Sequence, residues 1–268
     1  MIRDLVSPWL TAVDATDTTR ARGAFRARHA VVLESLRLAR APVLESFPLA
    51  TDSKLLHRLC LRAADPETQQ RLRDAVERAA ALGADRCDMI TLLAGGASGS
   101  AGEPLLRPEP QVVLFVELAE NASELIIAMA GAIAALTRWS GSGAVVHDRW
   151  EAARTVPLRE WIYTEGLGLH LAAALLPDLS PHHLLGINHA AFTRLREREK
   201  IFRTLLDADL DERGLGLPLR WLAPNAPLGP RTVGDVVLPP AAGRYLAWRM
   251  TAERVERVGL REALRAES

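Results

Sequence analysis

Apolar residues recur every three or four positions over most of the first eighty residues, which predicts amphipathic helices. The first helix is expected over 16–41 and the second over 52–64. The third has clear ends, because Asp65 suits the N-cap, Pro66 suits the first helical position and Gly83 follows the last turn. The apolar residues of the first helix are Phe25, Val32, Leu33, Leu36 and Leu38.

The pattern changes after this helical region. Short apolar runs with β-branched residues occupy 87–96 and 111–118, and each is bounded by Gly or Pro, which predicts two strands. The Gly- and Pro-rich segment 95–110 between them is expected to be an exposed loop. A third strand could lie within 234–239.

Helices are predicted again in the second half. Asn121 and Glu124 have the spacing of a capping box, so an apolar helix is expected to begin there and to end at 140–143. Later helices are expected over 158–176, 188–210 and 240–258, with a short turn starting at Ser180 and Pro181.

The predicted fold class is α+β, mostly helical, with a small sheet. We expect an N-terminal helical subdomain over 1–83 and an α+β domain over 84–268. No flexible linker separates the two, so one compact unit is the alternative.

The composition limits the classes of partner that the protein is expected to bind. Acidic and basic residues balance at 33 each, so no net charge favours nucleic acid or an anionic membrane.

The apolar centre 125–136 is shorter than the roughly 20 residues of a membrane span, which favours a buried helix. The N-terminus has no secretory signal pattern, and Cys60 and Cys87 do not form a C-x-x-C pair. We therefore expect a cytoplasmic protein with no nucleic-acid or membrane partner.

Complete catalytic motifs are missing from the sequence. The Gly-rich stretch 95–102 lacks the Lys of a P-loop, and Ser98 lacks the full frame of a nucleophile elbow. The seven histidines include no i, i+4 pair, so none forms a two-histidine metal motif on one helix face.

The order of elements in the second half carries a resemblance. A strand ending near Glu117 leads to the capped apolar helix, then to "REWIYTEGLGLHLAAALLP" and finally to "PPAAGRYLAWRMTAERV". Over roughly 85–258 this succession resembles the predicted zinc-dependent proteases of the gluzincin group. The resemblance implies a metallopeptidase-like helical core, in which the apolar helix carries H-E-x-x-H and a downstream Glu supplies the third zinc ligand.

This chain lacks the zinc-binding and catalytic side chains of the H-E-x-x-H pattern. Met129 and Ile133 stand where the two His would be, and Ala130 stands where the catalytic Glu would be. None of the three can bind Zn²⁺ or accept a proton in its place. Glu165 matches the third ligand, but it would need an Arg or His partner, because an unpaired carboxylate in such a region takes up a proton. We therefore expect no catalytic residue, no metal and no cofactor. The expected remnant cleft contains Glu165, His170, His147 and Glu117.

Three functions follow from these observations. The first is a degenerate, non-catalytic metallopeptidase-like protein that binds or regulates a peptide or protein partner, with a groove along strand 111–118 if that strand is an exposed edge. The second is an enzyme, with or without a metal ion, whose displaced site is built from His147, Glu165 and His170; a metal-dependent hydrolase, with zinc as its cofactor, is one form of it. The third is a structural module that forms homo-oligomers through apolar surface on its C-terminal helices.

Overall fold

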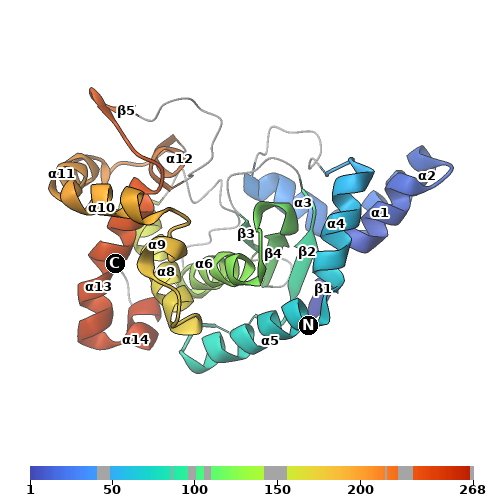
Figure 1. The fold of residues 1–268 in the computed structure, drawn as a ribbon, viewed down its shortest axis with the longest axis horizontal. Helices are drawn as coiled ribbons and strands as arrows, with labels where there is room; N and C mark the ends of the chain where they lie inside the picture. Colours follow the sequence, from blue (N-terminus) through green and yellow to red (C-terminus); the bar gives the residue numbers. More distant parts are fainter. Residues whose placement is uncertain are drawn as a thin grey trace.

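The chain folds into a mostly helical α+β structure with one mixed four-stranded sheet and one two-stranded hairpin, as the predicted fold class states. Helices α1, α2 and α4 lie at one end of the molecule and the helices from α8 onward at the other, with the sheet and α6 between them and α5 running beneath α6 (Figure 1). The structure is a computed structural model, and it describes residues 1–40, 49–85, 87–95, 101–105, 110–141, 156–214, 216–222 and 232–265.

The main sheet has the strand order β1-β2-β4-β3. β1, β2 and β4 are parallel, while β3 pairs antiparallel with β4 at one edge. Every residue of β2, β3 and β4 is buried, so these three strands lie inside the core and are covered on both faces. The four strands are β1 (Ile2–Asp4), β2 (Ile90–Leu93), β3 (Gly102–Leu105) and β4 (Gln111–Phe115).

Two of these strands correct the sequence prediction. The expected exposed loop 95–110 contains β3, whose Gly102 and Pro104 have the composition of a loop. Pro is tolerated there because β3 is an edge strand, where a missing N–H leaves no ladder bond broken. β1 is only three residues long and two of them are charged, so its apolar pattern is too short to detect. The strands predicted within 87–96 and 111–118 are confirmed.

Five helices lie before β2 in the described part of the chain. The helix predicted over 16–41 is two helices, because the chain leaves helical geometry at His29. The capping predicted at Asp65 is confirmed, with its Oδ2 accepting a hydrogen bond from Thr68 N at 2.8 Å. The helices are α1 (Val6–Asp14), α2 (Thr18–Arg28), α3 (Ala30–Arg40), α4 (Ser53–Ala64) and α5 (Pro66–Ala81).

A short 3-10 helix, η1 (Val116–Leu118), joins β4 to the central helix α6 (Ala122–Gly141). The predicted capping pair is present: Asn121 Oδ1 accepts from Glu124 N at 3.1 Å, and the Glu124 carboxylate accepts from Glu120 N at 2.7 Å. Two orphan donors at the start of α6 are therefore satisfied by side chains.

The described elements that follow α6 are helices, apart from one hairpin. The helix predicted over 188–210 is interrupted at Arg198, and the strand predicted within 234–239 pairs in a hairpin of its own, outside the main sheet. The helices are α8 (Leu158–Leu175), α9 (Pro181–Leu184), α10 (His189–Glu197), α11 (Glu199–Asp209), α12 (Gly216–Leu222), α13 (Ala242–Val258) and α14 (Leu260–Arg265). The hairpin strands are β5 (Thr232–Val233) and β6 (Val236–Val237).

Two hydrophobic cores meet at α8. The main core surrounds the sheet and takes residues from β1 to α14, on both sides of residue 83, so the packing does not divide at that position. The C-terminal core lies among α8 and the helices that follow it. α8 supplies Leu167 and Leu171 to the first core and Trp161 and Leu169 to the second, so its opposite faces connect them.

The apolar helix α6 is longer than its apolar centre. Its window Ala122–Trp139 is the one stretch in the described part of the chain that is long and apolar enough to cross a membrane. The length of the apolar segment therefore does not exclude a membrane span, although the shorter centre 125–136 suggested that it did. However, 61% of this window is buried inside the fold, against β3, β4 and α8, so here α6 is a core helix.

Candidate functional site

α6 and α8 cross in direct backbone contact. A Cβ built on Gly168 of α8 would lie 2.7 Å from Gly131 Cα, a distance that leaves no room for any side chain. Glu165 precedes Gly168 by three residues, and Met129 and Ile133 flank Gly131 by two. At 1.5 Å of rise per residue, all of these positions lie within about one helical turn of the crossing. The structure thus brings the two segments named by the resemblance together.

The three positions that the resemblance aligns with H-E-x-x-H are closed to solvent. Met129 and Ala130 are 0% exposed, Ile133 is 1% exposed, and all three belong to the main core. These aliphatic side chains need no polar partners in the interior, unlike two imidazoles and a carboxylate in the same places. The crossing is packed as a core and offers no open cleft at these residues.

Glu165 is paired with Arg244. Arg244 Nε donates to Glu165 Oε1 at 2.7 Å, and the two side chains are only 17% and 26% exposed, for Arg244 and Glu165 respectively. The same guanidinium donates to the carbonyls of Leu185, at 3.3 Å, and Leu184, at 3.5 Å. The expectation that Glu165 has a cationic partner is therefore met by an Arg on α13, within the segment "PPAAGRYLAWRM".

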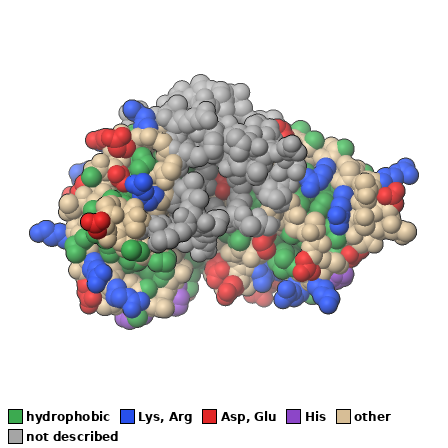
Figure 2. All heavy atoms as spheres, turned by 90° about the horizontal axis from the view of Figure 1, so that it is seen from above, with side chains coloured by type: hydrophobic (Ala, Val, Ile, Leu, Met, Phe, Trp, Pro, Cys, Tyr) green, Lys and Arg blue, Asp and Glu red, His purple; other side chains and the backbone are tan. Residues whose placement is uncertain are grey.

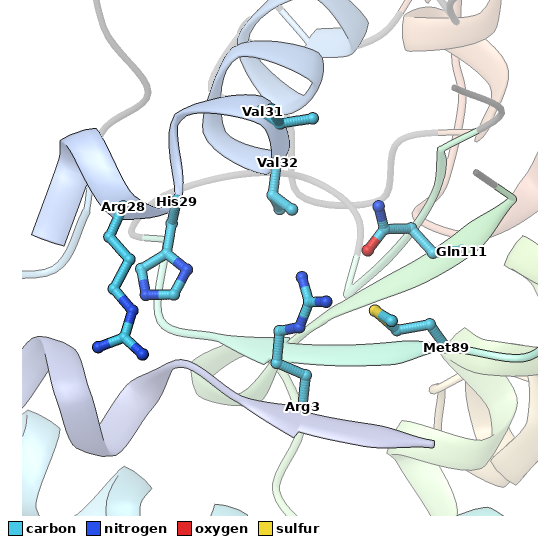
Figure 3. Close-up of a pocket in the computed structure, with 7 residues that line it drawn as sticks. All are labelled: Arg3, Arg28, His29, Val31, Val32, Met89 and Gln111. Carbon is cyan, nitrogen blue, oxygen red and sulfur yellow. The ribbon is translucent and has the colours of Figure 1, made fainter. Parts of the chain in front are cut away.

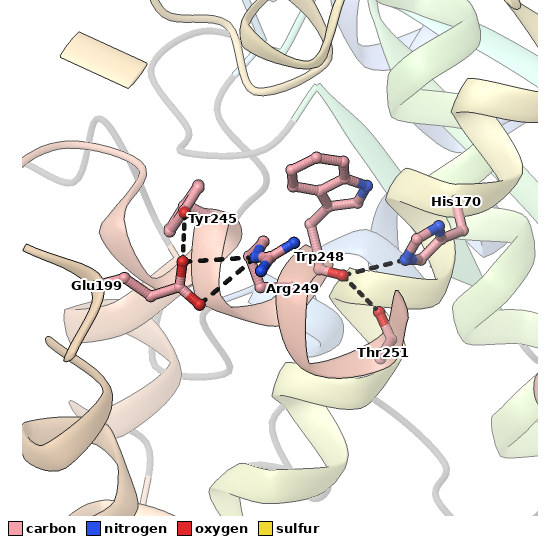
Figure 4. Close-up of polar contacts among 6 residues, drawn as sticks. All are labelled: His170, Glu199, Tyr245, Trp248, Arg249 and Thr251. Atoms are coloured by element: carbon pink, nitrogen blue, oxygen red, sulfur yellow. Dashed lines mark hydrogen bonds and ion pairs between the residues drawn. The ribbon is translucent and has the colours of Figure 1, made fainter. Parts of the chain in front are cut away.

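His170 faces a different neighbour. Its Nε2 lies 3.0 Å from the Trp248 carbonyl oxygen, which also accepts from Thr251 Oγ1 at 3.2 Å (Figure 4). Nε2 must carry the proton to donate to that oxygen, which leaves Nδ1 as the acceptor. Burial lowers the pKa of His170 below its usual value of 6.5. Glu165 and His170 thus have separate partners and do not converge on one site.

The remaining predicted site residues lie elsewhere. Glu117 is in η1, where its Oε1 accepts from Gly95 N at 2.7 Å and so anchors the backbone after β2. His147 lies outside the described residues. Within the described chain, no group of three or more His, Cys, Asp or Glu side chains is placed to hold a metal ion.

The predicted peptide groove is not available in its proposed form. Strand β4 lies between β2 and β3, and both of its edges are hydrogen-bonded. A peptide cannot add to a strand that has no free edge. The condition of an exposed edge at 111–118 is therefore wrong, and the edges of the main sheet are β1 and β3.

A second polar cluster was missed by sequence analysis. Tyr245 Oη donates to Glu199 Oε2 at 2.6 Å, and Arg249 pairs with the same carboxylate at 3.4 Å, which ties α13 to α11 (Figure 4). Burial, together with the Glu199 contact, raises the pKa of Tyr245 above its usual range. No local motif marks this cluster, because Glu199 is 46 and 50 positions from Tyr245 and Arg249, and only the tertiary fold brings them together.

The chain matches no protein-family model, and comparisons with curated proteins and with solved structures give no significant match.

Proposed function

We propose that this protein is a non-catalytic, metallopeptidase-like protein that acts by binding or regulating a peptide or protein partner. The observation that carries the proposal is the sealed crossing of α6 and α8. Aliphatic residues occupy the positions of the two His and the catalytic Glu, and Arg244 neutralises the remaining carboxylate of Glu165. A peptidase centre needs a metal-bound water at this place, and these side chains cannot supply it.

The arrangement of elements gives further support. The chain runs from β2 through the edge strand β3 to β4, then directly into α6, and α8 packs across α6. This is the succession on which the resemblance to gluzincin-type proteases rests. The proposal therefore treats the scaffold as retained and the catalytic residues as replaced.

A cytoplasmic location is part of the proposal. The free thiols of Cys60 and Cys87 suit a reducing compartment, and α6 is occupied by contacts within the fold. Acidic, basic and apolar side chains are interspersed on the described surface seen in Figure 2. A protein with such a surface recognises its partner through local contacts and not through a large net charge.

Metal analysis tests the proposal directly. Protein purified without chelators is expected to contain no stoichiometric zinc and to leave casein and peptide libraries uncut. Glu165→Ala is then expected to change neither result. Stoichiometric zinc that is lost in the Glu165→Ala variant would overturn the proposal and favour an enzyme with a displaced site.

A restoration experiment tests the scaffold itself. The combined variant Met129→His, Ala130→Glu and Ile133→His should gain about one zinc per chain if the crossing has metallopeptidase geometry. Adding Glu165→Ala to that variant is the matched control, and it should weaken the zinc affinity. A folded triple variant, checked by circular dichroism, that binds zinc equally well with and without Glu165 would contradict the resemblance.

A further inference from the structure

A polar pocket lies on the opposite face of the sheet from α6. Gly102 faces α6, since a Cβ at this position would meet the Ala128 carbonyl, and Gly102 pairs with Leu114 of β4. Side chains alternate between the two faces of a strand, so the row formed by Arg3, Thr91 and Val113 points the other way. The pocket is therefore independent of the proposed function.

This face of the sheet buries polar groups that a core does not need. Thr91 is fully buried, and its Oγ1 donates to Gln111 Oε1 at 3.2 Å. Gln111 is itself only 5% exposed, and it lines the pocket. Because its oxygen accepts from Thr91, its Nε2 is left to donate, and among the described residues it has no acceptor.

The cavity has a volume of about 240 Å³. One wall is cationic and the other is apolar, and the Arg3 guanidinium lies between His29 and Gln111 (Figure 3). None of the described lining residues is acidic. The residues that line it are Arg3, Arg28, His29, Val31, Val32, Met89 and Gln111.

Among the described residues, no acidic side chain pairs with the positive charge of this pocket. The side chains of Arg3 and Arg28 make no hydrogen bond or ion pair with any residue in the described part of the chain. The pKa of His29 is lowered by burial and by the nearby charges of Arg28 and Arg3. Arg3 is half-buried, and a buried Arg is usually paired with a carboxylate.

We propose that this pocket binds a small organic anion, with its carboxylate or phosphate head on Arg3 and the Gln111 amide and its apolar body against Val32 and Met89. The planar guanidinium of Arg matches both oxyanions through paired N–H donors. Arg28 and His29 add positive charge at the side of the pocket. The cavity is smaller than the roughly 300–1,000 Å³ of most ligand pockets, so the ligand is small.

Four probes test the proposal by calorimetric titration of the full chain: acetate, hexanoate, hexyl phosphate and hexylamine. Hexanoate or hexyl phosphate is expected to bind, acetate to bind more weakly because it lacks the apolar body, and hexylamine not to bind. Binding of only one of the two six-carbon anions would identify the head group as carboxylate or as phosphate. Absence of binding by both anions, or equal binding by hexylamine, would overturn the proposal.

Arg3→Gln should weaken anion binding about tenfold or more, as expected for the loss of a charge-assisted hydrogen bond. Arg28→Gln, at an exposed position, should weaken it less and keeps the test valid if Arg3→Gln does not fold. Arg58→Gln, an exposed Arg of α4 outside the pocket, is the matched control and should bind normally. The bound anion should also raise the pKa of His29 in a histidine NMR titration. Binding that is unchanged in both pocket variants would place the anion elsewhere.

Discussion

Arg244 connects three parts of the chain through one guanidinium group. It pairs with Glu165 on α8, donates to the carbonyls of Leu184 and Leu185 at the end of α9, and itself belongs to α13. Polar side chains in this interior are thus held by partners on other helices. The sequence predicts that Glu165 has a cationic partner. It does not identify Arg244 as that partner among the 31 arginines.

Removing Arg244 should destabilise the fold. In Arg244→Ala, the carboxylate of Glu165 keeps its partly buried position without a cation, so we expect the free energy of unfolding to fall by about 1–3 kcal/mol. Denaturant unfolding measures this change. The double variant Glu165→Gln with Arg244→Ala should lose less than the sum of the two single variants. Additive losses would show that the pair is not coupled.

His170 should make stability depend on pH. Its pKa in the folded state lies below 6.5 because of burial, so the unfolded chain binds more protons as the pH falls below that value. Stability is therefore expected to be full well above pH 6.5 and to decrease as the pH falls through 6.5, because the unfolded chain is then protonated first. His170→Gln should flatten this dependence in pH-resolved denaturation curves. An unchanged slope would indicate that other groups cause it.

At the scale of elements, the close crossing of α6 and α8 constrains one glycine. Gly168→Ala would gain helix propensity, but its Cβ would meet the Gly131 backbone at 2.7 Å and force the helices apart. We expect a net loss of about 1–3 kcal/mol in unfolding free energy, as for overpacked cores.

The matched control for that variant is Gly23→Ala on α2, where an added Cβ meets nothing within 4 Å. It should stabilise the protein by about 0.5–1 kcal/mol, because Gly is costly in a helix. Thermal unfolding of both variants separates propensity from packing. Equal effects at the two positions would refute the tight crossing.

Elements with local signals were predictable from the sequence. α5 carries its own N-cap, proline and terminal glycine, and α8 ends where Pro177 requires it. β3 was not predictable, since only pairing with β4 makes a strand of a Gly- and Pro-containing segment. The anion pocket has no motif either, because β1, the α2–α3 junction and β4 contribute one or a few residues each.

At the scale of the whole molecule, α8 belongs to both hydrophobic cores, so we expect them to unfold together. Trp9 reports on the main core and Trp221 on the C-terminal core, and each is 1% exposed. The fluorescence that Trp9→Phe removes from the wild-type signal reports on the main core, and the fluorescence that Trp221→Phe removes reports on the C-terminal core. The transitions of these two difference signals should coincide with the circular dichroism transition. Two separate transitions would show that the cores are independent folding units.

The pairing of β1 has a consequence for the order of folding during synthesis. Ile2 is synthesised well before its strand partner Ile90, and β2 in turn pairs with β4, which follows it in the chain. Helices α1 to α5, which lie between β1 and β2, can form from local contacts before the partner of β1 has been made. The sheet is therefore completed late, and β1 is expected to acquire its native neighbours after the helices that follow it.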